Sequence, residues 1–288
     1  MGHNLYEHHE EARRIFDRAD RILGFSLSGL CFEGPERELN HDLTAQLAVF
    51  TLGCALSAVL EKKNILPDAA AGYSSGFYAA AYAAGCFDFD TGLTIVKRAG
   101  EILLDEARKT KGCMAVIFGL PRQRVEKICN QTDGAEIAIV NTARQIIISG
   151  REAAVKKVMA IALKEGALDA YTLSAAAPYH SSFMAPAGSL FLRELKAMKL
   201  EKPETLLLSY HTLKRVGGAA SLKMIMAMQL SHPMLWLDLI KTMHRPETLF
   251  VELGAGSVLA RTVRWIDRKI DIVSLSDTRD MLKLGGKL

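Results

Sequence analysis

The chain has 288 residues, of which 49% are hydrophobic and 24% charged, and this ordinary composition excludes a disordered or collagen-like protein. The 36 Lys and Arg residues exceed the 32 Asp and Glu residues by only four, too small an excess to indicate a nucleic-acid partner. The five cysteines form no CxxC motif and have no histidine at ligand spacing. We therefore expect no metal site, no disulfide framework and a cytoplasmic location.

Helical patterns dominate the first part of the chain, with helices predicted over residues 10–22, 42–62 and 91–109. Two uncharged runs, 43–60 and 69–87, reach the length of a membrane span. Polar residues in the first run and several glycines in the second make both weak insertion signals. We expect both to be buried elements of a soluble core, with no membrane partner.

The pattern changes after residue 112. Short apolar runs at 114–118, 137–140, 145–149 and 168–173 surround helices predicted at 122–129 and 151–165. This β-α-β-β-α-β order predicts a ferredoxin-like subdomain over residues 112–175.

Strands alternate with helices again beyond this subdomain. Strands are predicted at 206–209, 249–253 and 272–275, and helices at 222–230, 235–243 and 258–268. The pattern predicts an α/β fold in which residues 1–111 and 176–288 form one larger domain with a mostly parallel sheet.

A GxSxG motif occupies residues 72–76, with a short strand predicted before it and an Ala-rich helix after it. In a nucleophile elbow of this kind, the strand turns sharply into the helix and presents the serine above the sheet edge. Ser74 is the candidate nucleophile, and the N–H of Ser75 would face an oxyanion. The general base is predicted to be His180, which lies between Pro178 and Pro186 in a stretch read as loop, although a structural role for this histidine is an open alternative.

These residues belong to a series of motifs in which the chain resembles the malonyl-CoA:acyl-carrier-protein transacylase family. The matching segments are residues 27–35, 44–46, 72–76, 112–120, 141–145, 148–150, 180–186, 232–236 and 252–256. The resemblance implies a hydrolase-like α/β domain with an inserted ferredoxin-like subdomain.

The resemblance also implies an acyltransferase. In this family the elbow serine, here Ser74, takes an acyl group from coenzyme A and passes it to the phosphopantetheine thiol of an acyl carrier protein through an acyl-serine ester. His180 would be the base, and a backbone carbonyl, expected near residues 254–256, would orient it. Acyl-CoA and the carrier protein would be substrates, with no bound cofactor.

The substrate pocket departs from the family pattern. Ala99 stands where the family has its carboxylate-binding arginine, and Arg98, one position away on a helix, is expected to point elsewhere unless the helix locally rewinds. Tyr73 and Phe77 replace more polar family residues, and Asn141 completes the assigned pocket. We expect selectivity to depart from malonyl, although simple packing would also explain Tyr73 and Phe77.

A second departure concerns the N-terminus, because the family's Gly-Gln-Gly-x-Gln loop, which supplies another oxyanion contact, has no counterpart before Met1 and Gly2. Three explanations stay open: a misassigned start, a partner that replaces the strand, or attenuated activity. Arg261, Arg264 and Arg268 form a basic helical stripe, which would steer an acidic carrier protein or be an ordinary solvated face.

Two other functions compete with acyl transfer. With water admitted to the acyl-enzyme, the same Ser74 and His180 would make a thioester hydrolase that acts on acyl carrier protein or acyl-CoA. A non-catalytic subunit of a synthase complex is the third hypothesis, motivated by the N-terminal departure.

Overall fold

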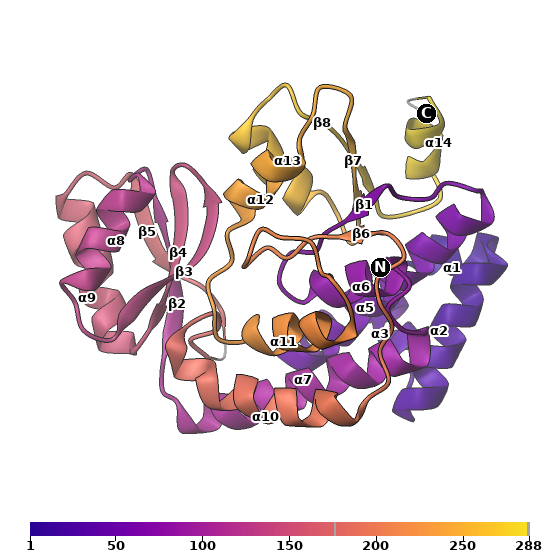
Figure 1. Ribbon diagram of the computed structural model, residues 1–288, viewed down its shortest axis with the longest axis horizontal. Coiled ribbons are helices and arrows are strands. Elements are labelled where there is room, and N and C mark those ends of the chain that lie inside the picture. The colour runs from indigo at the N-terminus through magenta and orange to yellow at the C-terminus, as the bar shows by residue number, and fades with distance from the viewer. Residues whose placement is uncertain (176, 287–288) are drawn as a thin grey trace.

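Helices make up most of the fold outside a four-stranded sheet, which lies at the left of Figure 1. The structure, a computed structural model, describes residues 1–175 and 177–286. Residue 176, where the second segment of the predicted larger domain begins, and residues 287–288 lie outside the described residues. The N-terminal part folds into α1 (His3–His8), α2 (Glu10–Leu23), α3 (Leu27–Glu33), α4 (Glu36–Leu39) and α5 (Asp42–Lys62).

Helix α5 runs through the main hydrophobic core and has the predicted bounds. By length and composition it is the one described helix that could cross a membrane, but 61% of its most apolar window is buried inside the fold. A helix that is apolar on all sides and packed inside a protein is a core helix. The prediction that this uncharged run is a buried element is therefore confirmed.

Parallel strand pairs organise the larger part of the molecule. β1 (Ala69–Ala70) pairs with β6 (Leu206–Leu207), and β7 (Leu249–Leu253) pairs with β8 (Asp271–Leu275), both in parallel. The predicted strand at 206–209 is short because the chain turns at Ser209, whose N–H donates to the Lys214 carbonyl. The surrounding helices are α6 (Gly76–Ala83), α7 (Phe89–Lys109), α10 (Ala185–Ala197), α11 (Ala219–Met228), α12 (Trp236–Met243), α13 (Val258–Ile266) and α14 (Asp280–Gly285).

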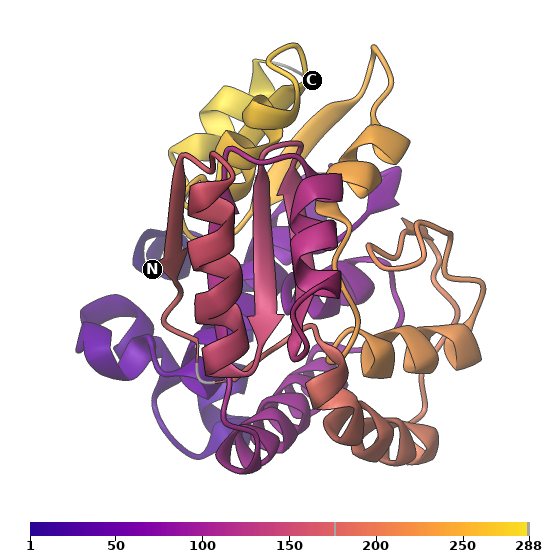
Figure 2. The same cartoon turned by 90° about the vertical axis from the view of Figure 1, so that its left-hand side faces the viewer.

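The four-stranded sheet is antiparallel throughout and has the strand order β3-β4-β2-β5. Figure 2 shows two helices side by side on one face of it. The elements are β2 (Cys113–Phe118), α8 (Arg122–Asn130), β3 (Ala135–Thr142), β4 (Gln145–Gly150), α9 (Glu152–Lys164) and β5 (Asp169–Thr172). This order is that of the ferredoxin-like unit, and a hydrophobic cluster around Ile117, Val125, Ile148 and Val155 fills the space between sheet and helices. The domain bounds at 112 and 175 stay a prediction.

Helix α10 corrects the interpretation of Pro186 as part of a loop, because the helix begins at Ala185, one residue before this proline. Proline is well tolerated in the first turn of a helix, where its missing N–H would have had no intrahelical partner. A short 3-10 turn over Ser182–Met184 leads into α10. His180 therefore lies just before a helix, within a shorter irregular segment than we predicted.

Candidate active site

The turn at residues 72–76 has the geometry of a nucleophile elbow. Ser74 has a φ of 50°, in the left-handed region that side-chain-bearing residues rarely occupy, and the N–H groups of Gly76 and Phe77 donate to the carbonyls of Tyr73 and Ser74 to start α6. A Cβ on Gly72 would lie 2.2 Å from the N atom of Phe77, so only glycine fits there. A Cβ on Gly76 would meet nothing within 4 Å outside its own helix, so the second glycine of the motif is not required for space.

Ser74 and His180 form a hydrogen-bonded pair, with 2.9 Å between Ser74 Oγ and His180 Nε2. His180 also has a positive φ, of 58°, and its N–H donates to the Leu230 carbonyl. The histidine side chain is buried, and the adjacent Tyr179 donates its hydroxyl to Asp42 at 2.7 Å. Two strained backbone positions, both fixed by hydrogen bonds, thus bring together residues that are 106 positions apart.

The imidazole of His180 is hydrogen-bonded to the backbone of Gln229 and to that of His232, whose carbonyl oxygen lies 3.3 Å from His180 Nδ1. A carbonyl oxygen can only accept, so this bond places the proton on Nδ1 and leaves the Nε2 lone pair facing Ser74. The expectation of an orienting group near residues 254–256 is therefore wrong. Glu252, on β7 just before that loop, has a structural role: its carboxylate accepts the N–H groups of Leu259 and Ala260 at the start of α13.

Burial lowers the pKa of His180 to about 4, because removing an imidazolium from water is unfavourable. The hydrogen bonds to the backbone of His232 and Gln229 raise the pKa, but their effect is weaker than that of burial. The imidazole is consequently neutral at neutral pH, which is the form that a general base needs.

The backbone N–H of Ser75 has no hydrogen-bond acceptor within the described part of the chain. It directly follows the nucleophile and is free to donate to an oxyanion, as the motif predicts. The N–H of Ser74 itself is engaged, since it donates to Met234 Sδ at 3.3 Å. The role assigned to Ser75 stays a prediction that this geometry supports.

The four residues assigned to the substrate pocket have different surroundings. Tyr73 donates its hydroxyl to Asn141 Oδ1 at 2.8 Å and lies edge-on to the ring of Trp236. Phe77 is fully buried with its ring edge against Tyr210, and Ala99 is also fully buried in the main core. The hydrogen bond between Tyr73 and Asn141 links the elbow to β3, whereas Phe77 has the packing environment of a core residue.

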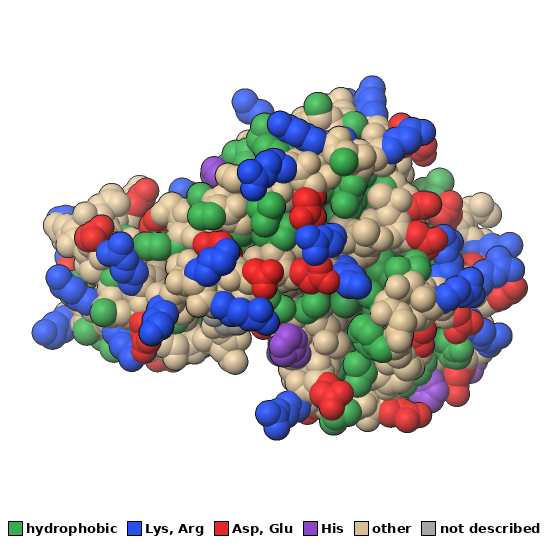
Figure 3. Space-filling view, turned by 90° about the horizontal axis from the view of Figure 1, so that it is seen from below, with side chains coloured by type: hydrophobic (Ala, Val, Ile, Leu, Met, Phe, Trp, Pro, Cys, Tyr) green, Lys and Arg blue, Asp and Glu red, His purple; other side chains and the backbone are tan. Residues whose placement is uncertain are grey.

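Arg98 has carboxylate partners of its own. Its guanidinium forms two hydrogen bonds with Glu194 on α10, at 2.7 and 3.0 Å, and a further ion pair with Glu101. The side chain is therefore engaged between α7 and α10, as expected if it points away from the substrate. On the face of the molecule seen from below, basic and acidic side chains are interspersed (Figure 3).

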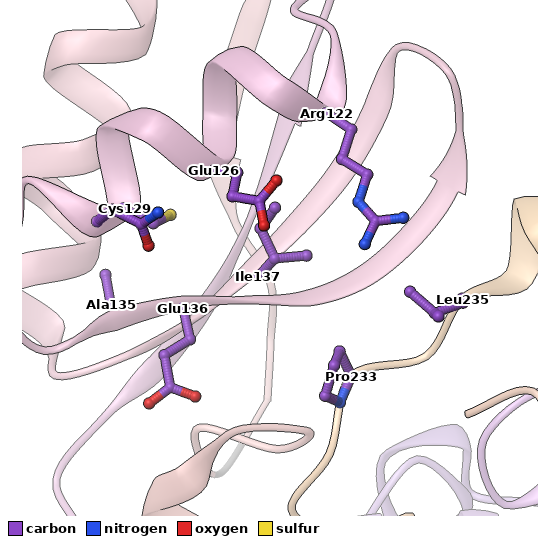
Figure 4. A pocket seen from close by; sticks show the side chains of 9 residues that line it. Arg122, Glu126, Cys129, Ala135, Glu136, Ile137, Pro233 and Leu235 are labelled. Atoms are coloured by element: carbon purple, nitrogen blue, oxygen red, sulfur yellow. The ribbon is translucent and has the colours of Figure 1, made fainter. Parts of the chain in front are cut away.

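The described surface includes two hollows that bear on the site and the basic stripe. The first, of about 420 Å³, is lined by the predicted basic stripe of Arg261, Arg264 and Arg268 together with Trp265, whose side chain is 72% exposed. The second, of about 210 Å³, lies between the four-stranded sheet and the segment that follows His232 (Figure 4). The side chains labelled in the figure are those of Arg122, Glu126, Cys129, Ala135, Glu136, Ile137, Pro233 and Leu235.

Within the described residues, no group of three His, Cys, Asp or Glu side chains is placed to hold a metal ion. The arrangement instead provides a nucleophile, a neutral base and a free N–H donor, which together suit acyl transfer through serine. Sequence reasoning missed the roles of His232 and Met234. The matching segment at 232–236 was the available signal, but it did not indicate which of its atoms would contact the site.

Comparisons with known proteins give matches to acyltransferases. Residues 1–272 match the family model described as an acyl transferase domain. The chain is 31% identical over 282 residues to the malonyl CoA-acyl carrier protein transacylase of Bacillus subtilis (strain 168), covering 96% of this chain and 89% of that protein. It is also 31% identical over 276 residues to the polyketide biosynthesis malonyl CoA-acyl carrier protein transacylase PksC of the same organism, covering 93% and 92%. A solved structure of the malonyl CoA-acyl carrier protein transacylase from Coxiella burnetii superposes with a TM-score of 0.95 at 27% identity, covering 100% of this chain and 93% of that one.

Proposed function

From the premise that this chain belongs to the acyl transferase domain family, whose matching relatives include malonyl-CoA:acyl-carrier-protein transacylases, we propose that it is a serine acyltransferase with Ser74 as nucleophile. It moves an acyl group from coenzyme A to the phosphopantetheine thiol of an acyl carrier protein. The observation that carries the proposal is the 2.9 Å contact between Ser74 Oγ and His180 Nε2, with His180 Nδ1 directed at the His232 carbonyl.

In the first half-reaction, neutral His180 takes the proton of the Ser74 hydroxyl while Oγ attacks the thioester carbonyl. The negative charge that develops on the carbonyl oxygen is stabilised by the Ser75 N–H. As the tetrahedral intermediate collapses, the C–S bond breaks and His180 returns the proton to the departing coenzyme A thiolate. An acyl-serine ester and a free thiol result.

The second half-reaction runs the same steps in reverse order with a different thiol. His180 deprotonates the phosphopantetheine thiol, and the thiol sulfur attacks the acyl-serine carbonyl. As the tetrahedral intermediate collapses, the ester C–O bond breaks and His180 returns the proton to Ser74 Oγ. Burial of His180 favours transfer over hydrolysis, because the surroundings of the base exclude water.

The acyl group that we propose is uncharged. A malonyl carboxylate would need a cationic partner, since burying it unpaired is strongly unfavourable. Ala99 provides none, and Arg98 is already bound to Glu194 and Glu101. We place the enzyme in the cytoplasm, which the free thiols of all five cysteines support.

Intact-protein mass spectrometry tests this function. The purified chain and a Ser74→Ala variant are each mixed with malonyl-, acetyl- and longer acyl-CoAs, and holo carrier protein is then added. We expect a Ser74-dependent adduct with uncharged acyl groups, weak or absent labelling by malonyl-CoA, and transfer of the adduct to the carrier protein.

Each other outcome contradicts a particular part of the proposal. A strong malonyl adduct would refute the assignment of selectivity to Ala99. Release of the free carboxylic acid, without acylation of the carrier protein, would indicate a hydrolase. An adduct that persists in Ser74→Ala would exclude Ser74 as nucleophile, and no adduct from any donor would favour a non-catalytic subunit.

A further inference from the structure

Residues 232–236, which we call the clamp segment, contact Ser74, His180 and Tyr73. The His232 carbonyl accepts from His180, the Met234 sulfur accepts from Ser74, and the Trp236 ring lies against Tyr73. The segment also crosses from the larger part of the molecule to the four-stranded sheet, as Figure 4 shows for its proline and leucine.

The backbone of Met234 is fixed on the sheet. Its N–H donates to the Ala138 carbonyl at 2.8 Å, and its carbonyl accepts the Val140 N–H at 2.9 Å. These bonds form an isolated parallel bridge to β3, one of the two edge strands of the sheet. Because the bridge immobilises the Met234 backbone, the position of its Cα atom, and hence the start of the side chain, is fixed.

The side chain of Met234 reaches the nucleophile from there. Its Sδ lies 3.3 Å from the backbone N of Ser74, and the methionine is fully buried. Ser74 has a positive φ, and Met234 Sδ is the acceptor that the described structure provides for its N–H. A thioether is a weak acceptor, but a buried N–H without any acceptor is unfavourable.

We propose that Met234 is a positioning residue, whose sulfur accepts the Ser74 N–H and holds the elbow in the strained conformation that places Ser74 Oγ beside His180. The alternative is that Met234 only fills space in the core. The two roles are separable, because leucine has nearly the same volume as methionine but no acceptor. The effect on catalysis rests on the proposed function, whereas the hydrogen bond itself does not.

The experiment compares Met234→Leu with Met226→Leu. Met226, on α11, is equally buried and has no polar contact among the described residues, so it is a matched control for the volume change. Single-turnover acylation is measured by mass spectrometry over a range of acyl-CoA concentrations. In parallel, hydrogen exchange of the Ser74 amide is followed by NMR in protein labelled with 15N-serine, where the Ser74→Ala variant identifies the signal.

We expect Met234→Leu to lower the maximal acylation rate about tenfold with little change in the concentration dependence, since a displaced nucleophile slows chemistry more than binding. We also expect its Ser74 amide to exchange faster, while Met226→Leu matches the wild type in both measurements. A cooperative thermal unfolding transition is required of both variants, as the control that they are folded.

Equal acylation rates in the two variants would overturn the proposal, as would slow acylation with an unchanged Ser74 amide. If Met234→Leu does not fold, hydrogen exchange in the wild-type protein still tests the proposal. Fast exchange of the Ser74 amide there would contradict the hydrogen bond to Met234. If the wild type forms no adduct, the proposed function fails and the amide measurement alone tests Met234.

Discussion

The pH dependence of acylation follows from the burial of His180. Its pKa is lowered from 6.5 to about 4, so the neutral base predominates down to mildly acidic pH. At pH 5.5, a group with a pKa of 4 is about 97% neutral, whereas one with a pKa of 6.5 is only about 9% neutral. We therefore expect the acylation rate at pH 5.5 to be almost the same as at pH 7.5, and not about tenfold lower.

The assay is single-turnover acylation of the protein between pH 4.5 and 8. A simple acyl thioester without phosphate groups replaces acyl-CoA, so that titration of the donor does not affect the profile. Circular dichroism at each pH confirms that the fold is intact, and Ser74→Ala gives the background. A rate that falls with a midpoint near pH 6.5 would refute the reasoning, because it would show that His180 is not desolvated.

Stability provides a second measurement of the same shift. The unfolded chain binds a proton at His180 with a pKa near 6.5, while the folded protein does so only near 4. Folding stability linked to this group is therefore full above pH 6.5 and is lost as pH falls from 6.5 to 4, by up to about 3 kcal/mol. Urea denaturation should show that His180→Gln loses less stability over this interval than the wild type does. Parallel curves for the two proteins would count against the shift.

Three substitutions test other contacts. Arg98→Ala should leave the acylation rate within about twofold and lower the free energy of unfolding by less than about 1 kcal/mol, because a partly exposed ion pair contributes little. A much larger fall in the acylation rate would show that Arg98 binds substrate. Tyr73→Phe should lower the free energy of unfolding by about 1–2 kcal/mol, since Asn141 loses its buried donor, whereas the exposed control Tyr171→Phe should be neutral in the same urea titration. Glu252→Ala should cost about 1–2 kcal/mol by uncapping α13, and a thermal unfolding midpoint equal to that of the wild type would contradict this role.

Sequence patterns correctly predicted the elements that depend on a short stretch of chain or on a regular spacing of apolar residues. The apolar run at 42–62 became α5 with the same bounds, and the β-α-β-β-α-β order became the antiparallel sheet with its two helices. The elbow was predictable because close approach of its backbone to the next helix requires a glycine at position 72. The prediction of a loop around Pro186 was wrong, because proline breaks a helix only in its interior and is favourable in the first turn, where it lies in α10.

The contacts that complete the site were less accessible to sequence reasoning. His180 is oriented in part by the backbone carbonyl of His232, 52 residues further along the chain. Every residue has such a carbonyl, so the sequence does not single this one out. Met234 contacts the site through its sulfur atom, and a buried methionine side chain usually serves only to fill space in the core. Neither contact has a distinctive residue type, and both depend on how β3 meets the larger part of the fold.

The bridge between Met234 and β3 has a consequence for exchanging parts between members of the family. A chimaera with junctions at residues 112 and 175 would take β3 from one parent and the clamp segment from the other. The bridge itself uses only N–H and C=O groups, which any parent supplies, so the recombined protein would keep this register. The pair formed by Tyr73 and Asn141 consists of side chains on opposite sides of the junction, and it would have to be inherited from the same parent.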